Sequence, residues 1–223
     1  MERRLQITAD GSHTVSVPEW NVTYHSIHGA IRESLHVYIE EGLKYQLSKK
    51  AGDVLSILEM GFGTGLNALL TFRESIRERK RIYYQTIEQY PLTYTETDPL
   101  NYAEQLKEPS SQSCLITLHS VPWDEDVQLH PDFCLHKIHG ALQDVVFTRA
   151  FDIVYYDAFD PVAQPELWTE DIFGKLYNCL VPGGILVTYC SKGNVRRAMM
   201  AAGFTVEKLP GPPHKREMIR AIR

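Results

Sequence analysis

Gly61-Phe62-Gly63-Thr64-Gly65-Leu66-Asn67 is the stretch of sequence that decides the fold. It follows an apolar run, residues 54–60, that is typical of a buried strand, and it precedes a segment with helical periodicity to about residue 77. Glycines at such a turn let the backbone approach a bound ligand closely. A nicotinamide-binding turn needs a further glycine at its sixth position, where this chain has Leu66. The loop therefore favours a cofactor other than a nicotinamide, with a plain tight turn as the alternative.

An acidic residue ends the next predicted strand, residues 81–88. A carboxylate at Glu88 can accept hydrogen bonds from both hydroxyls of an adenosyl ribose. Taken alone, Glu88 could equally be a solvated residue at a strand end. The glycine loop and the acid occur in the order that adenosyl binding requires, so together they favour the cofactor site.

Apolar runs alternate with helical segments from residue 54 onward, which predicts an α/β fold with a mostly parallel sheet. Further strands are predicted at 133–139, 151–157, 185–190, 204–209 and 216–221, and helices at 101–107, 165–179 and 193–202. Pro182-Gly183-Gly184 is interpreted as the turn before the strand at 185–190. No helix separates the last two strands, so we expect them to form an antiparallel hairpin.

The chain is predicted to have two parts, an N-terminal appendage at residues 1–50 and a Rossmann-like domain at residues 51–223. Short strands at 5–8 and 15–17 flank Asp10-Gly11, a pattern that favours a hairpin. An amphipathic helix is expected at residues 28–47.

Composition excludes several classes of protein. The chain begins with a polar segment and has no long apolar run, which predicts a soluble, cytoplasmic protein with no membrane partner. The formal charge of -5 does not attract nucleic acid by itself, so any RNA contact must come from a local basic face. The four cysteines are expected to be reduced thiols. No metal site is expected, because His25 and His28 lack further ligands at suitable spacing.

Several longer stretches are similar to signatures of the MnmC/MnmD methyltransferases: Glu59-Met60-Gly61-Phe62-Gly63-Thr64-Gly65-Leu66-Asn67, Glu88-Gln89-Tyr90-Pro91-Leu92, Tyr156-Asp157-Ala158-Phe159-Asp160-Pro161, Gln164-Pro165-Glu166-Leu167-Trp168-Thr169 and Gly211-Pro212-Pro213-His214-Lys215-Arg216-Glu217-Met218. Asp10-Gly11-Ser12, Tyr24-His25-Ser26 and Glu33-Ser34 extend the similarity to the N-terminal region. The family often has an acid after the glycine that follows its third strand, where this chain has Ala141. The residue that recognises adenine is therefore left open.

This resemblance implies a class I, S-adenosyl-L-methionine-dependent methyltransferase with a stand-alone methyltransferase domain and no FAD oxidoreductase domain. The implied reaction methylates the exocyclic amine of 5-aminomethyl(-2-thio)uridine at the tRNA wobble position, giving 5-methylaminomethyl(-2-thio)uridine. The implied partners are the tRNA anticodon region and a separate enzyme that supplies the aminomethyl nucleoside. Oligomeric state is not predicted.

Asp157, at the end of the fourth strand, is the predicted catalytic residue. Ligands of open α/β sheets gather at the carboxyl ends of the strands, which places Asp157 beside the glycine loop. A carboxylate there can position an amine and stabilise the positive charge that develops as the amine attacks a methyl group. A helix-capping aspartate is the alternative. Predicted cofactor-binding residues are Gly61, Phe62, Gly63, Thr64, Gly65, Asn67, Glu88 and Asp157, and the resemblance adds Tyr24, Ser26 and Glu33.

The predicted substrate-binding residues are Phe159, Pro161, Lys192, Lys215 and Arg216. Phe159 and Trp168 could stack on a uracil ring, as aromatic side chains do with splayed-out bases, or could be ordinary core aromatics. The lysines and Arg216 are candidate phosphate contacts. Two other functions stay open: a class I methyltransferase acting on a small-molecule amine or hydroxyl, and a non-catalytic adaptor with a cofactor fold.

Overall fold

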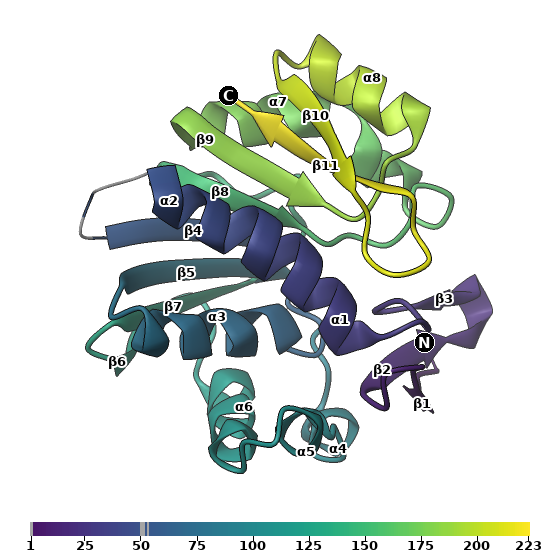
Figure 1. Ribbon diagram of the computed structural model, residues 1–223, viewed down its shortest axis with the longest axis vertical. Helices are drawn as coiled ribbons and strands as arrows, with labels where there is room; N and C mark the ends of the chain where they lie inside the picture. Colours follow the sequence, from purple (N-terminus) through teal and green to yellow (C-terminus); the bar gives the residue numbers. More distant parts are fainter. Residues whose placement is uncertain (1, 50–51, 53) are drawn as a thin grey trace.

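The computed structural model describes residues 2–49, 52 and 54–223. Its main sheet has the strand order β10-β11-β9-β8-β4-β5-β7-β6 (Figure 1). The strands are β4 Val54–Met60, β5 Arg81–Glu88, β6 Asp126–His130, β7 Phe133–His139, β8 Phe151–Tyr156, β9 Leu180–Thr188, β10 Thr205–Pro210 and β11 Glu217–Ile222. The central strands pair in parallel, whereas β10 and β11 form an antiparallel hairpin that joins β9 at one side. The predicted α/β fold with a C-terminal hairpin is confirmed.

Helices cover both faces of the sheet (Figure 1). One face carries α1 Ala30–Ser34, η2 Leu35–Lys44, α2 Tyr45–Lys49, α3 Leu66–Arg77 and α6 Ser110–Ser120, and the other carries α7 Glu170–Cys179 and α8 Gly193–Ala201. A hydrophobic core lies on each side, with Leu69 and Tyr155 on the first and Phe173 and Val154 on the second. Because β8 is covered on both faces, all of its residues are buried. Its side chains are aliphatic or aromatic except for Asp152, whose Oδ2 accepts from the backbone N–H of Ser56 at 2.8 Å.

The helix of residues 30–49 is continuous, and its middle part, η2, is π-helical. Val37, Tyr38 and Leu43 from this helix are buried in the core of the first face. Gly42 lies so close to the sheet that a Cβ would be 3.1 Å from side-chain atoms of Tyr155 and of Val187. We expected this helix to belong to an N-terminal unit, and it packs on the central strands and shares their core. The expected boundary at residues 50–51 lies outside the described residues, and the division into two parts stays a prediction.

The N-terminal strands form a small antiparallel sheet in the order β1-β2-β3, with bounds β1 Arg4–Ile7, β2 His13–Val17 and β3 Val22–Thr23. The predicted hairpin around Asp10-Gly11 is confirmed by the β1–β2 pairing. The strand β3 follows a 3-10 turn, η1 Pro18–Trp20, and was not predicted. Polar contacts attach this sheet to the rest of the molecule: Arg3 pairs with Glu96 at 3.2 Å, and Asn101 Oδ1 accepts from the backbone of His13 at 2.8 Å.

Between β5 and β7 the chain forms short helices, α4 Tyr94–Thr97 and α5 Tyr102–Gln105, and then α6 and β6. We predicted a helix near α5 but neither α6 nor β6. In α6 only Ser111, Leu115 and Leu118 are buried, and the edge strand β6 is polar, so neither has a strong hydrophobic pattern.

The predicted turn at Pro182-Gly183-Gly184 was wrong, because these residues lie within β9. β8 and β9 shift register after the pair Phe151 and Leu180, and a Cβ on Gly184 would lie 3.2 Å from the Phe151 carbonyl oxygen. The glycine is needed for this close approach. The predicted helix at 165–179 is divided into η3 Pro165–Trp168 and α7, whose first turn is capped by the Thr169 side chain. Among the described residues, no helix is both long and apolar enough to cross a membrane.

Candidate active site

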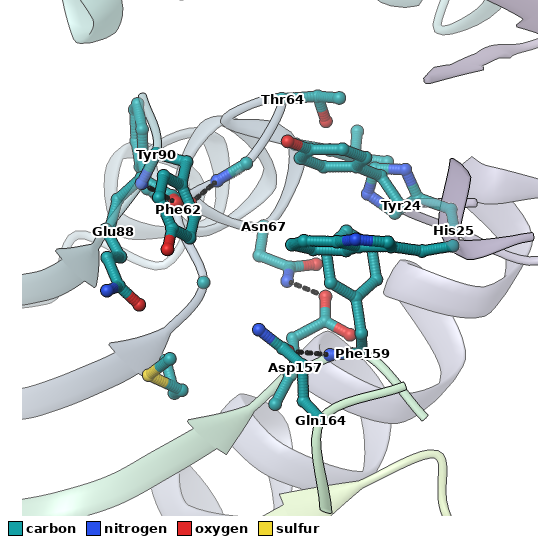
Figure 2. Close-up of a pocket in the computed structure, with 17 residues that line it drawn as sticks. Tyr24, His25, Phe62, Thr64, Asn67, Glu88, Tyr90, Asp157, Phe159 and Gln164 are labelled. Atoms are coloured by element: carbon teal, nitrogen blue, oxygen red, sulfur yellow. Dashed lines mark hydrogen bonds between the residues drawn. The ribbon is translucent and has the colours of Figure 1, made fainter. Parts of the chain in front are cut away.

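A pocket lies at the carboxyl ends of β4, β5 and β8, where the sequence places the glycine loop, Glu88 and Asp157 (Figure 2). Parallel strands bring these loops to one edge of the sheet, as expected for a ligand site in an open α/β fold. The pocket is lined by Trp20, Tyr24, His25, Met60, Gly61, Phe62, Gly63, Thr64, Leu66, Asn67, Glu88, Gln89, Tyr90, Asp157, Ala158, Phe159 and Gln164.

The glycine loop packs against the end of β8 and against the N-terminal segment. Gly61 has a φ of +90°, and a Cβ on it would lie 2.9 Å from the carbonyl oxygen of Asp157. At Gly63, with a φ of +50°, a Cβ would lie 2.9 Å from the Tyr24 ring. Both positions therefore require glycine, for backbone conformation and for space. With glycine at both positions, the backbone of the loop forms the floor of the pocket.

Glu88 stands at one end of this floor (Figure 2). Its Oε2 accepts from the backbone N–H of Gly63 at 2.9 Å, and its Oε1 accepts from the backbone N–H of Tyr90 at 2.8 Å. Each carboxylate oxygen has two lone pairs, so both keep acceptor capacity for a ligand. A fixed carboxylate beside an open glycine floor suits the two adjacent hydroxyls of a ribose, which is what S-adenosyl-L-methionine presents.

Asp157 lies on the other side of the glycine loop (Figure 2). Asn67, in the first turn of α3, donates its Nδ2–H to Asp157 Oδ2 at 2.9 Å. Burial raises the pKa of Asp157 from its usual 3.8 to about 7, since it removes the carboxylate from water. The nearby Tyr38 hydroxyl lowers this pKa, the charge of Glu33 raises it, and Asn67 and Lys215 lower it. Near neutral pH this carboxyl therefore exists in both protonation states and can accept or return a proton.

Aromatic side chains form the wall beside Asp157. Phe159 meets Tyr24 edge to face with ring centroids 5.1 Å apart, and meets Trp20 in the same manner at 6.1 Å. The Phe159 backbone is fixed at both ends, because its N–H donates to Gln164 Oε1 at 3.1 Å and its carbonyl accepts from Trp168 Nε1 at 2.8 Å. Trp168 itself is a buried residue of the second core.

A second cavity lies on the far side of this wall. It shares Tyr24, His25, Ala158 and Phe159 with the first pocket, and it is also lined by Ser26, Glu33, Asp160, Tyr189 and Lys215. Here Lys215 Nζ lies 2.5 Å from Glu33 Oε2 and 4.0 Å from the centre of the Tyr189 ring. The two cavities therefore share the wall formed by Phe159 and its neighbours, whereas Asp157 lines only the pocket with Glu88.

The predicted site residues are distributed over both spaces. The first pocket contains Gly61, Phe62, Gly63, Thr64, Asn67, Glu88, Tyr24, Asp157 and Phe159, and the second contains Ser26, Glu33 and Lys215. Within the described residues, Gly65, Pro161, Lys192 and Arg216 line neither space. Gly65 instead precedes α3 with a left-handed φ of 74°, and Lys192 pairs with Asp160 at 2.6 Å. Their assigned roles stay predictions.

We predicted no site role for Trp20, His25 or Tyr38, although His25 lies in the family-like stretch Tyr24-His25-Ser26. Trp20 and His25 come from the N-terminal segment, and Tyr38 from the helix that packs over the sheet. Nothing in the local sequence marks Trp20 or Tyr38, because they reach the site only through tertiary packing. In the part of the chain that the structure describes, no cluster of three or more His, Cys, Asp or Glu could hold a metal ion.

Comparison with known proteins places this fold and site in a family. A family model of S-adenosyl-L-methionine-dependent methyltransferases matches residues 99–223. The tRNA 5-methylaminomethyl-2-thiouridine biosynthesis bifunctional protein MnmC of Pseudomonas entomophila (strain L48) is 31% identical over 237 residues, which cover 99% of this chain and 35% of the relative. The protein of the same name from Aeromonas salmonicida (strain A449) is 32% identical over 216 residues, covering 90% and 32%. The chain thus spans about a third of the length of these curated relatives.

Solved structures agree in fold. The crystal structure of MNMC2 from Aquifex aeolicus matches with a TM-score of 0.80 at 26% identity, covering 99% of this chain and 69% of that one. Spermidine synthase from Thermotoga maritima matches with a TM-score of 0.54 at 15% identity, covering the same shares, which shows a common fold alone. The chain belongs to the family of S-adenosyl-L-methionine-dependent methyltransferases, and the resemblance to MnmC methyltransferases seen in its sequence is confirmed.

Proposed function

We propose that this protein methylates the exocyclic amine of 5-aminomethyl(-2-thio)uridine at the wobble position of tRNA, giving the 5-methylaminomethyl form. The names of the MnmC relatives support this substrate. The observation that carries the proposal is the position of Asp157, a buried carboxyl with its pKa raised to about 7 in the glycine-loop pocket, directly before Ala158 and Phe159, which line both cavities. An amine entering from the second cavity would meet a group able to take its proton.

In this proposal the first pocket holds the cofactor. Glu88 accepts hydrogen bonds from the ribose hydroxyls, while Gly61 and Gly63 allow close approach of the backbone. Phe62, Thr64, Gly65 and Asn67 complete or support the loop, and Tyr24 and Ser26 close the methionine end. When bound, S-adenosyl-L-methionine supplies a methyl group whose bond to sulfur breaks as a bond to the acceptor nitrogen forms.

Asp157 carries the proton chemistry. An alkylammonium has a pKa of about 10, so the acceptor arrives protonated and without a free electron pair. Ionised Asp157 accepts one proton from the ammonium, which becomes a neutral amine and can attack. The neutral amine then attacks the methyl group while its N–H donates to a carboxyl oxygen of Asp157, which orients the nitrogen. The product is a secondary ammonium, and the proton on Asp157 is released to water.

The residues that would bind the acceptor are assigned by the chemical type of their side chains. Phe159, with Pro161 in the same loop, offers an aromatic surface for the uracil ring of a nucleotide turned out of the anticodon loop. Lys192 and Arg216 are the candidates for phosphate contacts. A tRNA acceptor implies a cytoplasmic enzyme and another activity that installs the aminomethyl group beforehand.

Incubation with labelled S-adenosyl-L-methionine tests the proposal. The acceptors are tRNA that carries 5-aminomethyl-2-thiouridine and, in a second reaction, the free nucleoside. The expected result is label in 5-methylaminomethyl-2-thiouridine from tRNA after digestion to nucleosides. Absence of label in the tRNA would refute the wobble assignment, and label in the free nucleoside alone would favour a small-molecule methyltransferase.

A further inference from the structure

Lys215 occupies a site that is built for an ammonium group. Its Nζ lies 2.5 Å from Glu33 Oε2 and 4.0 Å from the centre of the Tyr189 ring. The Glu33 side chain is only 7% exposed, and its other oxygen accepts from the backbone N–H of Ser26 at 3.0 Å. A nearly buried carboxylate beside an aromatic face binds a cation well, because the carboxylate is costly to bury without one and the ring face is negative.

The site belongs to the acceptor side of the active centre. Glu33, Tyr189 and Lys215 line the second cavity and are absent from the lining of the pocket that contains the glycine loop and Glu88. The charges of Glu33 and Lys215 nonetheless reach Asp157, where they shift its pKa in opposite directions. An ammonium held by Glu33 is therefore close enough to the catalytic carboxyl to act on it electrostatically.

Lys215 is carried by the loop between β10 and β11, which rests on the N-terminal segment (Figure 1). The His214 ring stacks on His28 with centroids 4.2 Å apart, and His36 Nε2 lies 2.8 Å from the Pro210 carbonyl oxygen. These contacts are few and polar. The Lys215 side chain is 31% exposed, and its charge also lowers the pKa of Asp160 at the same cavity.

We propose that Glu33 and the Tyr189 ring form the binding site for the aminomethyl group of the acceptor, and that Lys215 fills this site until the acceptor displaces it. The proposal rests on the amine acceptor of the proposed function. A lysine side chain and a 5-aminomethyl substituent end in the same group, a methylene bearing a primary ammonium. The site can therefore exchange one for the other with no change in charge. In this role Lys215 competes with the substrate and does not contact its phosphates.

The test replaces Lys215 by methionine, which keeps the length of the side chain and removes the ammonium. Lys208→Met is the matched control, since Lys208 lies on the same hairpin and pairs with Glu217 at 2.8 Å. Binding of n-butylammonium is followed by NMR on the full chain. We expect Lys215→Met to bind it at least about tenfold more tightly than the wild type or the control. Adding Glu33→Gln to Lys215→Met should abolish this gain, with circular dichroism confirming the fold.

Kinetics then decide whether the site serves the acceptor. Lys215→Met should lower the KM for tRNA and leave the affinity for S-adenosyl-L-methionine unchanged. A raised KM for tRNA would mean that Lys215 contacts the tRNA. Tighter binding of S-adenosyl-L-methionine would assign the site to the amine of the cofactor. Either result would overturn the proposal, and so would unchanged binding of n-butylammonium. The n-butylammonium titration needs no tRNA. A wild type that fails to methylate tRNA would therefore remove the proposed function without deciding the titration.

Discussion

The side-chain amide of Asn67 donates a hydrogen bond to Asp157 Oδ2 at 2.9 Å, which joins the first turn of α3 to the end of β8. The bond fixes one carboxylate oxygen and leaves Asp157 oriented toward the pocket (Figure 2). In the proposed function, the glycine loop that precedes α3 therefore makes room for the cofactor and positions Asn67, which orients Asp157.

Replacing Asp157 by asparagine should lower kcat by about 10²-fold or more, since the group that accepts the proton of the ammonium is lost. Cofactor affinity, measured by isothermal titration calorimetry, should change little, because the amide keeps the shape of the carboxyl. Asn67→Ala should lower kcat less, by roughly tenfold, as it removes the orienting bond alone. Unchanged turnover in Asp157→Asn would refute the catalytic assignment.

The pH dependence of kcat/KM should show a limb near pH 7. Methyl transfer requires ionised Asp157, and burial raises the pKa of this carboxyl to about 7. Activity should therefore rise with pH through this region and fall as pH drops below it. The measurement is the initial rate at low tRNA concentration across pH 5.5 to 8.5 (a range of about three units centred on that pKa). A limb that persists in the residual activity of Asp157→Asn would assign the titration to another group.

Glu88→Gln should weaken binding of S-adenosyl-L-methionine by about tenfold, the loss expected for a hydrogen bond to a charged acceptor. A glutamine has one acceptor oxygen, so it cannot keep the Gly63 and Tyr90 bonds together with two ribose hydroxyls. Calorimetric titration of the cofactor measures the change. Glu104→Gln, at an exposed position on α5, is the control and should bind as the wild type does. Equal affinities in the two variants would exclude Glu88 from the cofactor site.

The parts of the site that the sequence predicted are those defined by local structure. A strand, a glycine turn and a helix follow one another at residues 54–77, and parallel strands bring Glu88 and Asp157 to the same edge. Trp20 and Tyr38 were not predicted because their positions depend on how the N-terminal segment folds over that edge. Lys215 was predicted at the site as a phosphate contact, and only the structure places its ammonium against Glu33.

The same distinction between local structure and tertiary packing explains which strands were predicted correctly and which were not. β8 was found because burial on both faces gives it a run of β-branched and aromatic residues that only Asp152 interrupts. β6 pairs with β7 at the edge of the sheet and is partly exposed, so its sequence has no strong pattern. The glycines of β9 suggest a turn, yet Gly184 permits a close approach to the Phe151 backbone within the sheet. The sequence of a single chain does not show whether a glycine forms a turn or permits a close approach of two strands within a sheet.

Gly61→Ala should destabilise the protein by about 2 kcal/mol or more and abolish cofactor binding. The new Cβ would lie 2.9 Å from the Asp157 carbonyl oxygen, at a φ of +90° that alanine rarely adopts. Gly174→Ala is the matched control, because its Cβ would meet nothing within 4 Å and the residue lies inside α7. It should stabilise the protein by about 0.5–1 kcal/mol. Urea denaturation measures both, and equal free energies of unfolding would contradict the steric account.

Glu59→Gln should change how stability depends on pH. Burial raises the pKa of Glu59 from 4.5 to about 8, so the folded protein holds a proton that the unfolded chain releases above pH 4.5. The free energy of unfolding of the wild type therefore falls as pH rises from about 4.5 to about 8. Glutamine lacks this titration and can still accept from the Thr86 hydroxyl, which lies 2.8 Å from Glu59 Oε2. From pH 5 to pH 8 the free energy of unfolding of the variant should rise relative to that of the wild type by up to about 4 kcal/mol, since each pH unit in which only the folded state is protonated contributes about 1.36 kcal/mol. Denaturation at the two pH values measures this change. A constant difference between the two proteins would show that Glu59 is not protonated in the folded state.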